Sequence, residues 1–146
     1  MTAKDFLWSI RSEDLELKTL GEQIKHTRQE AEGVRAMQLS DMPKGGKGVD
    51  AAALLAEVVD LQTIYFEKAR AIVRKRKLAT DIIMTMDSVE QKSVLSLRYL
   101  CGKSWDDIVD IMHYAYSGVY KLHGAALQEF AKKYDSCERV ELSGVK

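Results

Sequence analysis

Polar side chains suited to binding a nucleic acid gather between positions 103 and 121 of the chain. The six that stand out are Lys103, Ser104, Tyr116, Ser117, Tyr120 and Lys121. Lysine and serine bind phosphate oxygens, and side chains in the first turns of a helix reach base edges when that helix enters the major groove of DNA. This chemistry requires helices that begin close to Ser104 and Tyr116.

Helix-start and helix-stop residues predict three short helices, over residues 89–100, 105–112 and 116–133. Ser88 and Ser104 are expected to cap the first two of these helices. A serine oxygen at such a position accepts a hydrogen bond from a free backbone N–H group of the first turn. The polar side chains would therefore stand at the beginnings of the second and third helices.

The joints between these helices predict a helix-turn-helix. Gly102 is expected to take the left-handed backbone that ends the first helix. A helix-turn-helix then needs a small residue, a turn residue four positions later and an apolar anchor six positions after that. Val109, His113 and Val119 occupy those positions, although valine is large for the crossing and glycine would suit the turn better than histidine. This spacing is shared by a helix-turn-helix and a generic three-helix bundle.

The same stretch resembles the C-terminal half of ArpU-type late-gene transcriptional regulators, small phage and prophage proteins of Gram-positive bacteria. The matching residues are Leu97 to Leu100, Gly102 to Trp105, Asp107, Ile108, Met112, Tyr114, Val119 to Gly124, Ala126 and Leu127. That module is similar to the fourth conserved region of bacterial sigma factors, which binds promoter DNA. The resemblance implies double-stranded DNA as the partner and late-gene regulation in a bacterial host as the role.

This chain departs from the family pattern in its charge. The family often carries basic residues where this chain has Ser117 and Ala125, so the expected recognition helix keeps Lys121 and His123 as basic groups. Of these, His123 is expected to pack or hydrogen-bond rather than bind a ligand. Phosphate contacts dominate DNA affinity, so one module should bind weakly. Dimerisation would recover affinity by placing two modules on two half-sites.

Composition and periodicity predict an all-α fold. Apolar residues make up 46% of the 146-residue chain, and one proline and nine glycines interrupt it; few helix breakers with regular apolar spacing favour helices. We expect a long antiparallel, coiled-coil-like hairpin over residues 1–87 that sets the oligomer. A three-helix DNA-binding module follows over 88–134, and a mobile tail over 135–146.

The hairpin is predicted from two long helices, over residues 3–38 and 49–86, joined by a loop over 39–48. The first has an apolar heptad seam, which begins with Ala3, Phe6 and Ile10. The second has a wider apolar stripe, which indicates contact with more than one neighbour. We therefore expect copies of the chain to associate through the second helix into a homo-oligomer, with a dimer favoured.

A basic cluster in the second helix offers further phosphate contacts. The candidates are Arg74, Lys75 and Lys77. The alternative is an ordinary solvated helix face, and Arg76 is expected to pair with an acid on the first helix, such as Glu13 or Glu16. The chain as a whole carries a formal net charge of +0, so DNA binding would depend on local charge.

Other classes of function find little support in the sequence. Neither Cys101 nor Cys137 has metal-ligand spacing, and no phosphate-binding loop or catalytic motif is present. We expect no metal, no cofactor and no enzymatic activity. The absence of a signal peptide and of a membrane-spanning run predicts a cytoplasmic protein without membrane contact.

Two alternatives to a DNA-binding regulator stay open. The first is a helical assembly or adaptor protein that binds RNA polymerase or another protein through a degenerate module. The second is a small terminase subunit that recognises phage DNA, since such proteins join helix-turn-helix modules to helical oligomerisation elements.

Overall fold

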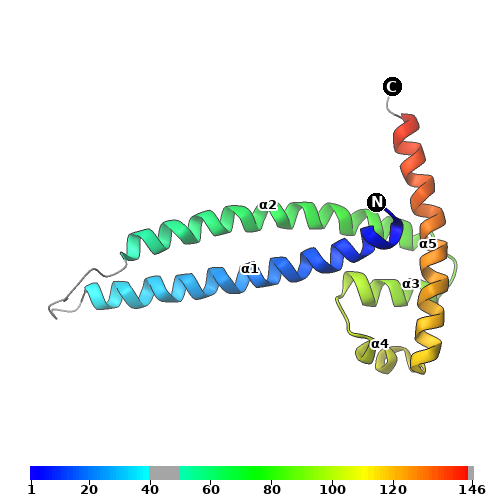
Figure 1. Cartoon of the computed structure of the whole chain (residues 1–146), viewed down its shortest axis with the longest axis horizontal. Coiled ribbons are helices and arrows are strands. Elements are labelled where there is room, and N and C mark those ends of the chain that lie inside the picture. Colours follow the sequence, from blue (N-terminus) through cyan, green and yellow to red (C-terminus); the bar gives the residue numbers. More distant parts are fainter. Residues whose placement is uncertain (40–49, 145–146) are drawn as a thin grey trace. The chain divides into compact units, whose positions relative to one another are not determined.

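A computed structural model describes residues 1–39 and 50–144, and the described residues form an all-α protein (Figure 1). Its helices are α1 (Ala3–Gln38), α2 (Ala51–Met84), α3 (Val89–Leu95), α4 (Trp105–Met112) and α5 (Tyr116–Gly144). A π-helical turn, η1 (Ser96–Leu100), continues α3. The predicted fold, a helical hairpin followed by a helical module, is confirmed. The predicted loop lies outside the described residues, apart from Leu39.

The chain divides into two compact units, Leu15–Ala71 and Met1–Asp14 with Ile72–Lys146. The boundary between them crosses both long helices. It does not fall between residues 87 and 88, where the sequence suggests a division between the hairpin and the module.

Within the unit Leu15–Ala71, α1 and α2 run antiparallel. Glu16 pairs with Lys68 at 3.7 Å, and a Cβ atom added to Gly21 would lie 3.6 Å from the Tyr65 ring. As residue numbers rise along α1, the residue numbers of the contacting positions on α2 fall, as in an antiparallel pair. Seam residues Thr27 and Ala31 are buried on α1, which confirms the expected heptad seam in this part of the helix.

The other unit holds one hydrophobic core, to which all the helices contribute. Its fully buried side chains include Leu7, Ile10, Val94, Leu95, Ile108, Val119 and Phe130. α3 packs against α5, and α4 also contacts α5. The first turns of α1 therefore share a core with the helix-turn-helix, because Leu7 and Ile10 belong to the same cluster as Val119.

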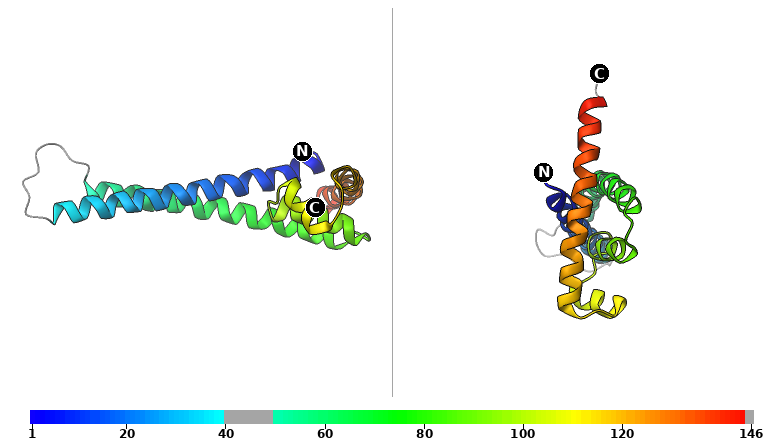
Figure 2. Two further views of the ribbon diagram at one scale, coloured as in Figure 1. Left: turned by 90° about the horizontal axis from the view of Figure 1, so that it is seen from below. Right: turned by 90° about the vertical axis from the view of Figure 1, so that its right-hand side faces the viewer.

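The prediction that the last helix ends near Lys133 is wrong, because α5 continues without a break to Gly144 (Figure 2). Tyr134 is buried and stacks on Phe6 of α1, with ring centroids 5.1 Å apart, and Cys137 packs against the same core. Residues 135–144 are thus helical rather than a mobile tail. The remaining tail residues, 145–146, lie outside the described part of the chain.

The joints of the module follow from local hydrogen bonding. Ser88 accepts a hydrogen bond from the Gln91 N–H at 3.2 Å, and caps α3 as predicted. At the other end of the α3–η1 segment, Gly102 has a φ of 68°, and the Lys103 N–H donates to the Leu97 carbonyl at 2.9 Å. The left-handed glycine predicted at this joint is confirmed.

Two glycine substitutions should have opposite effects on stability. Gly33→Ala removes a flexible residue from α1 where an added Cβ meets nothing within 4 Å, so the free energy of unfolding should rise by about 1 kcal/mol. Gly102→Ala places a side chain on a residue with left-handed backbone, so the free energy of unfolding should fall by about 1–2 kcal/mol. Urea unfolding of the two variants measures both changes; a free energy of unfolding that is unchanged or raised in Gly102→Ala would contradict this account of Gly102.

Candidate nucleic-acid interface

The backbone between α4 and α5 has the turn that the sequence predicts. His113 ends α4 with φ 58° and ψ 40°, in the left-handed region. Histidine enters this region more readily than most residues that have a Cβ atom, which explains how the turn forms without glycine. Val119, the expected anchor, is fully buried, and Val109 packs against the core at the crossing.

The beginning of α4 presents Lys103 and Ser104 to solvent. The Ser104 oxygen caps the helix and accepts a hydrogen bond from the Asp107 N–H at 3.2 Å, so its own O–H group stays able to donate to a phosphate oxygen. The exposed Lys103 side chain adds a positive charge in the same loop. Both residues thus stand where the sequence analysis places phosphate contacts.

The first turns of α5 present the other four predicted contacts, and all are exposed. The Tyr116 O–H donates to an Asp106 carboxylate oxygen, and this hydrogen bond raises the pKa of Tyr116. Tyr120 lies edge-on to Trp105 of α4, with ring centroids 5.2 Å apart. These contacts leave about half of each tyrosine surface exposed (47% and 49%), and they hold the rings beside Ser117 and Lys121.

His123 lies behind this surface and is not part of it. Its Nε2 atom shares a hydrogen bond of 2.8 Å with the Tyr99 hydroxyl, and its ring meets Trp105 edge-on at 4.8 Å. Burial, reinforced by the charges of Arg98 and Lys4, lowers its pKa to about 4. His123 is therefore neutral at pH 7, and the packing role predicted for it is confirmed.

The predicted basic cluster of α2 is largely paired within the protein. Lys75 lies 2.5 Å from a Glu13 carboxylate oxygen and also donates to Ser9. Arg76 pairs with Asp14, an acid of the first helix as predicted, although Glu13 and Glu16 were the acids expected.

Lys77 and Arg74 remain at the surface. Lys77 lies 3.4 Å from Asp81 with both side chains exposed, and Arg74 is exposed. Lys75 is already occupied as an internal ion-pair partner, which makes Arg74 and Lys77 the better candidates for a phosphate contact among the three.

Two arginines that the sequence pattern does not single out lie beside Lys103. An Nη1 atom of Arg11 donates to the Arg98 carbonyl at 2.8 Å and to the Lys103 carbonyl at 3.2 Å. Arg98 also donates to the Lys103 carbonyl at 3.2 Å. No local signal reveals this cluster, because Arg11 stands 92 positions before Lys103.

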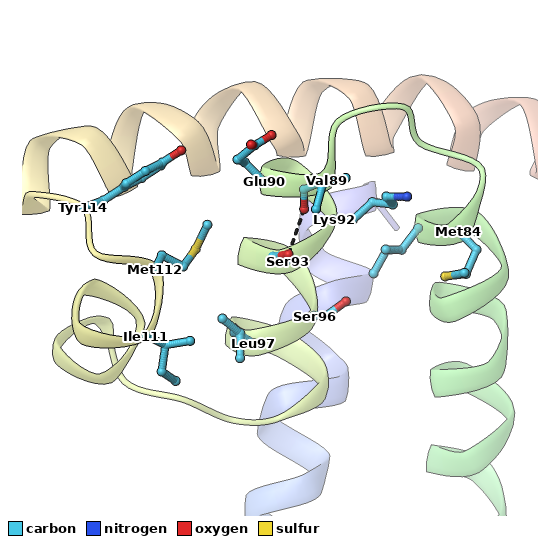
Figure 3. A pocket seen from close by; sticks show the side chains of 11 residues that line it. Met84, Val89, Glu90, Lys92, Ser93, Ser96, Leu97, Ile111, Met112 and Tyr114 are labelled. Atoms are coloured by element: carbon cyan, nitrogen blue, oxygen red, sulfur yellow. Dashed lines mark hydrogen bonds between the residues drawn. The ribbon is translucent and has the colours of Figure 1, made fainter.

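An apolar groove of about 660 Å³ opens on another side of the module (Figure 3). It runs between the end of α2, α3 and the joint after α4, and Figure 3 shows Met112 and Tyr114 facing the α3–η1 segment across it. None of the six predicted DNA contacts lines this groove. The module therefore has two distinct surfaces, one polar and one apolar.

Comparison with models of known protein families, with curated proteins and with solved structures finds no match to this chain. Among the described helices, none has the length and apolar character needed to span a membrane.

Acidification should destabilise the protein through His123. Its folded pKa of about 4 lies below the ordinary value of 6.5, so the unfolded chain binds a proton first as the pH falls. The contribution of neutral His123 to the free energy of unfolding is complete above pH 6.5 and is lost as the pH falls toward 4. Because the ring is only partly shielded from solvent, we expect a loss of about 1–2 kcal/mol.

The measurement is urea unfolding at several pH values for the wild type and for His123→Gln. The variant should lack this component, while acid effects of the carboxylates stay common to both proteins. Identical pH profiles would show that His123 does not titrate in this way.

Proposed function

We propose that this protein is a sequence-specific DNA-binding transcriptional regulator that acts in a bacterial cytoplasm, encoded by a phage or prophage and directed at late genes. The observation that carries the DNA-binding part is the exposed polar start of α5 on a helix-turn-helix backbone. The resemblance to ArpU-type regulators supplies the late-gene part. The proposal assigns no enzymatic activity to the chain.

In this function, α5 enters the major groove with its first two turns. Ser117 and Lys121 have polar groups on the exposed surface, and Tyr116 and Tyr120 add hydroxyls on rings already oriented by Asp106 and Trp105. Such oriented groups lose less conformational freedom when they meet base edges. Lys103 and Ser104 would hold a phosphate and so fix the position of the module along the duplex.

Dimerisation would use an exposed apolar stripe on α2. Leu55, Val59 and Phe66 lie on one face of the helix, and Val59 and Phe66 are 60% and 62% exposed. Packing this stripe against the same stripe of a second copy would remove its apolar side chains from water.

The apolar groove favours a second candidate function, that of an adaptor that binds RNA polymerase or another protein. Met84 and Val89 at its edge are 68% and 65% exposed. Contiguous exposed apolar surface often marks a protein contact. A regulator can use both surfaces, since the groove and the start of α5 share no residue.

Charge reversal at Lys103 and Lys121 tests the DNA interface. Lys103→Glu and Lys121→Glu should each weaken binding and lower the slope of log affinity against log salt by about 1 or more. Lys25→Glu, an exposed site on α1, is the matched control and should change neither. Fluorescence anisotropy with DNA upstream of the neighbouring genes, between about 50 and 200 mM salt, measures both quantities.

The same titrations separate the two functions. Absence of binding by the dimeric wild-type protein at low salt would contradict the DNA-binding proposal. Wild-type binding that neither Lys103→Glu nor Lys121→Glu alters would place DNA elsewhere on the molecule. A partner captured through the groove without DNA would favour the adaptor.

Phe66→Glu should convert a dimer into a monomer, because it places a charge in the centre of the apolar stripe. Ile64→Glu is the matched control: Ile64 is also exposed but stands two residues away, on a different side of α2. Light scattering coupled to size exclusion measures the mass of each variant. A dimer that persists in Phe66→Glu would exclude this face as the interface.

A further inference from the structure

We propose that Arg11, Arg98 and Lys103 form a site for one backbone phosphate of DNA, which joins the first turns of α1 to the helix-turn-helix as a DNA-contacting unit. The inference rests on the proposed DNA-binding function and extends it to two residues outside the predicted contacts. It concerns one compact unit, since residues 1–14 and 72–146 belong together.

Positive charge is crowded at one carbonyl oxygen, that of Lys103. Arg11 and Arg98 both donate to the Lys103 carbonyl, each at 3.2 Å. The charge of Arg11 and, more strongly, burial lower the pKa of Arg98. Both arginines are half-buried, so water screens their repulsion less than it would on an open surface.

The two arginines have no ion-pair partner within the described part of the chain. Over residues 1–39 and 50–144, no carboxylate forms an ion pair with Arg11 or Arg98. The half-buried cations Lys75 and Arg76, in contrast, are each paired with an acid. Half-buried cations without an anion are costly, and a bound anion would remove that cost.

The Arg98 side chain is held in place before any ligand binds. The Arg98 guanidinium lies over the Trp105 ring at 4.3 Å and near the Trp8 ring at 5.9 Å. Stacking on aromatic rings and hydrogen bonds to backbone carbonyls fix the guanidinium plane before any ligand arrives. A planar, fixed guanidinium suits phosphate oxygens well.

The residues around the cluster favour one kind of anion. Trp105 contacts both Arg98 and Tyr120, so the cluster adjoins the start of α5, where a duplex would lie. Asp106 and Asp107 follow in the first turn of α4 and would repel a doubly charged phosphate more than a singly charged one. A phosphodiester of the DNA backbone therefore fits better than free inorganic phosphate.

The test compares the salt dependence of DNA binding in wild type, Arg11→Gln and Arg28→Gln, a control at an exposed site of α1. Arg11→Gln should lower the slope of log affinity against log salt by about 1, and Arg28→Gln should not. Arg11→Lys should keep the slope, because it keeps the charge; a purely structural Arg11 would weaken affinity with an unchanged slope. An unchanged slope in Arg11→Gln would overturn the site while the proposed function stands.

A second measurement needs no arginine variant. The two tryptophans of the chain, Trp8 and Trp105, both flank Arg98, so their fluorescence reports on this site. DNA should change their emission with the same midpoint as the anisotropy, and inorganic phosphate should change it less than DNA at matched ionic strength. No change on DNA binding would overturn the site. A larger response to inorganic phosphate than to DNA would assign the site to a free anion. If the wild-type protein bound no DNA at all, the proposed function would be overturned as well.

Discussion

The packing of α5 against α3 and the first turns of α1 determines what the rest of the unit can present. Val119 and Phe130 are fully buried on α5, and Tyr134 extends the same face onto Phe6. A helix buried along one face must expose the opposite face, and on α5 that face begins with Ser117 and Lys121, while the exposed Tyr116 and Tyr120 lie to its side. The exposed polar start of α5 is thus a consequence of its buried apolar face.

The second constraint is the left-handed residue at His113. It turns the chain sharply between α4 and α5, so that Ile108 and Val119 meet in one core although they stand on different helices. The same turn brings Trp105 against Tyr120 and His123. Through Trp105, the position of Arg98 is coupled to the start of α5, and so the cationic cluster and the polar surface lie side by side.

Much of this fold follows from local sequence signals. Ser88, Gly102 and Ser104 each have the cap geometry that their residue type favours, because caps depend on neighbours in the chain. The heptad seam of α1 can likewise be predicted from the sequence, since its apolar positions recur with a helical period. Local signals therefore suffice for the fold class and for the beginnings of α3, α4 and α5.

Features that depend on distant partners were not predictable in this way. The last turns of α5 have few apolar residues, and Tyr134 packs against Phe6, a residue that is distant in the sequence. Arg11 meets the Arg98 carbonyl across 87 positions of sequence, and nothing near Arg11 indicates that contact. DNA binding itself stays a prediction, supported by the exposure of the polar side chains and by the turn that orients them.

A net charge of zero does not prevent a protein from holding DNA, because affinity follows the local potential. In the hairpin, Lys68, Lys75 and Arg76 are each matched by an acid of α1. Near the start of α4, Arg11, Arg98 and Lys103 lie together, and among the described residues none of them forms an ion pair with a carboxylate. In the proposed function, this cluster would be the place where the chain holds a phosphate, although its net charge is zero. Since one such place offers few phosphate contacts, two copies on one duplex would be needed for tight binding, and this links the charge distribution of the module to the apolar stripe on α2.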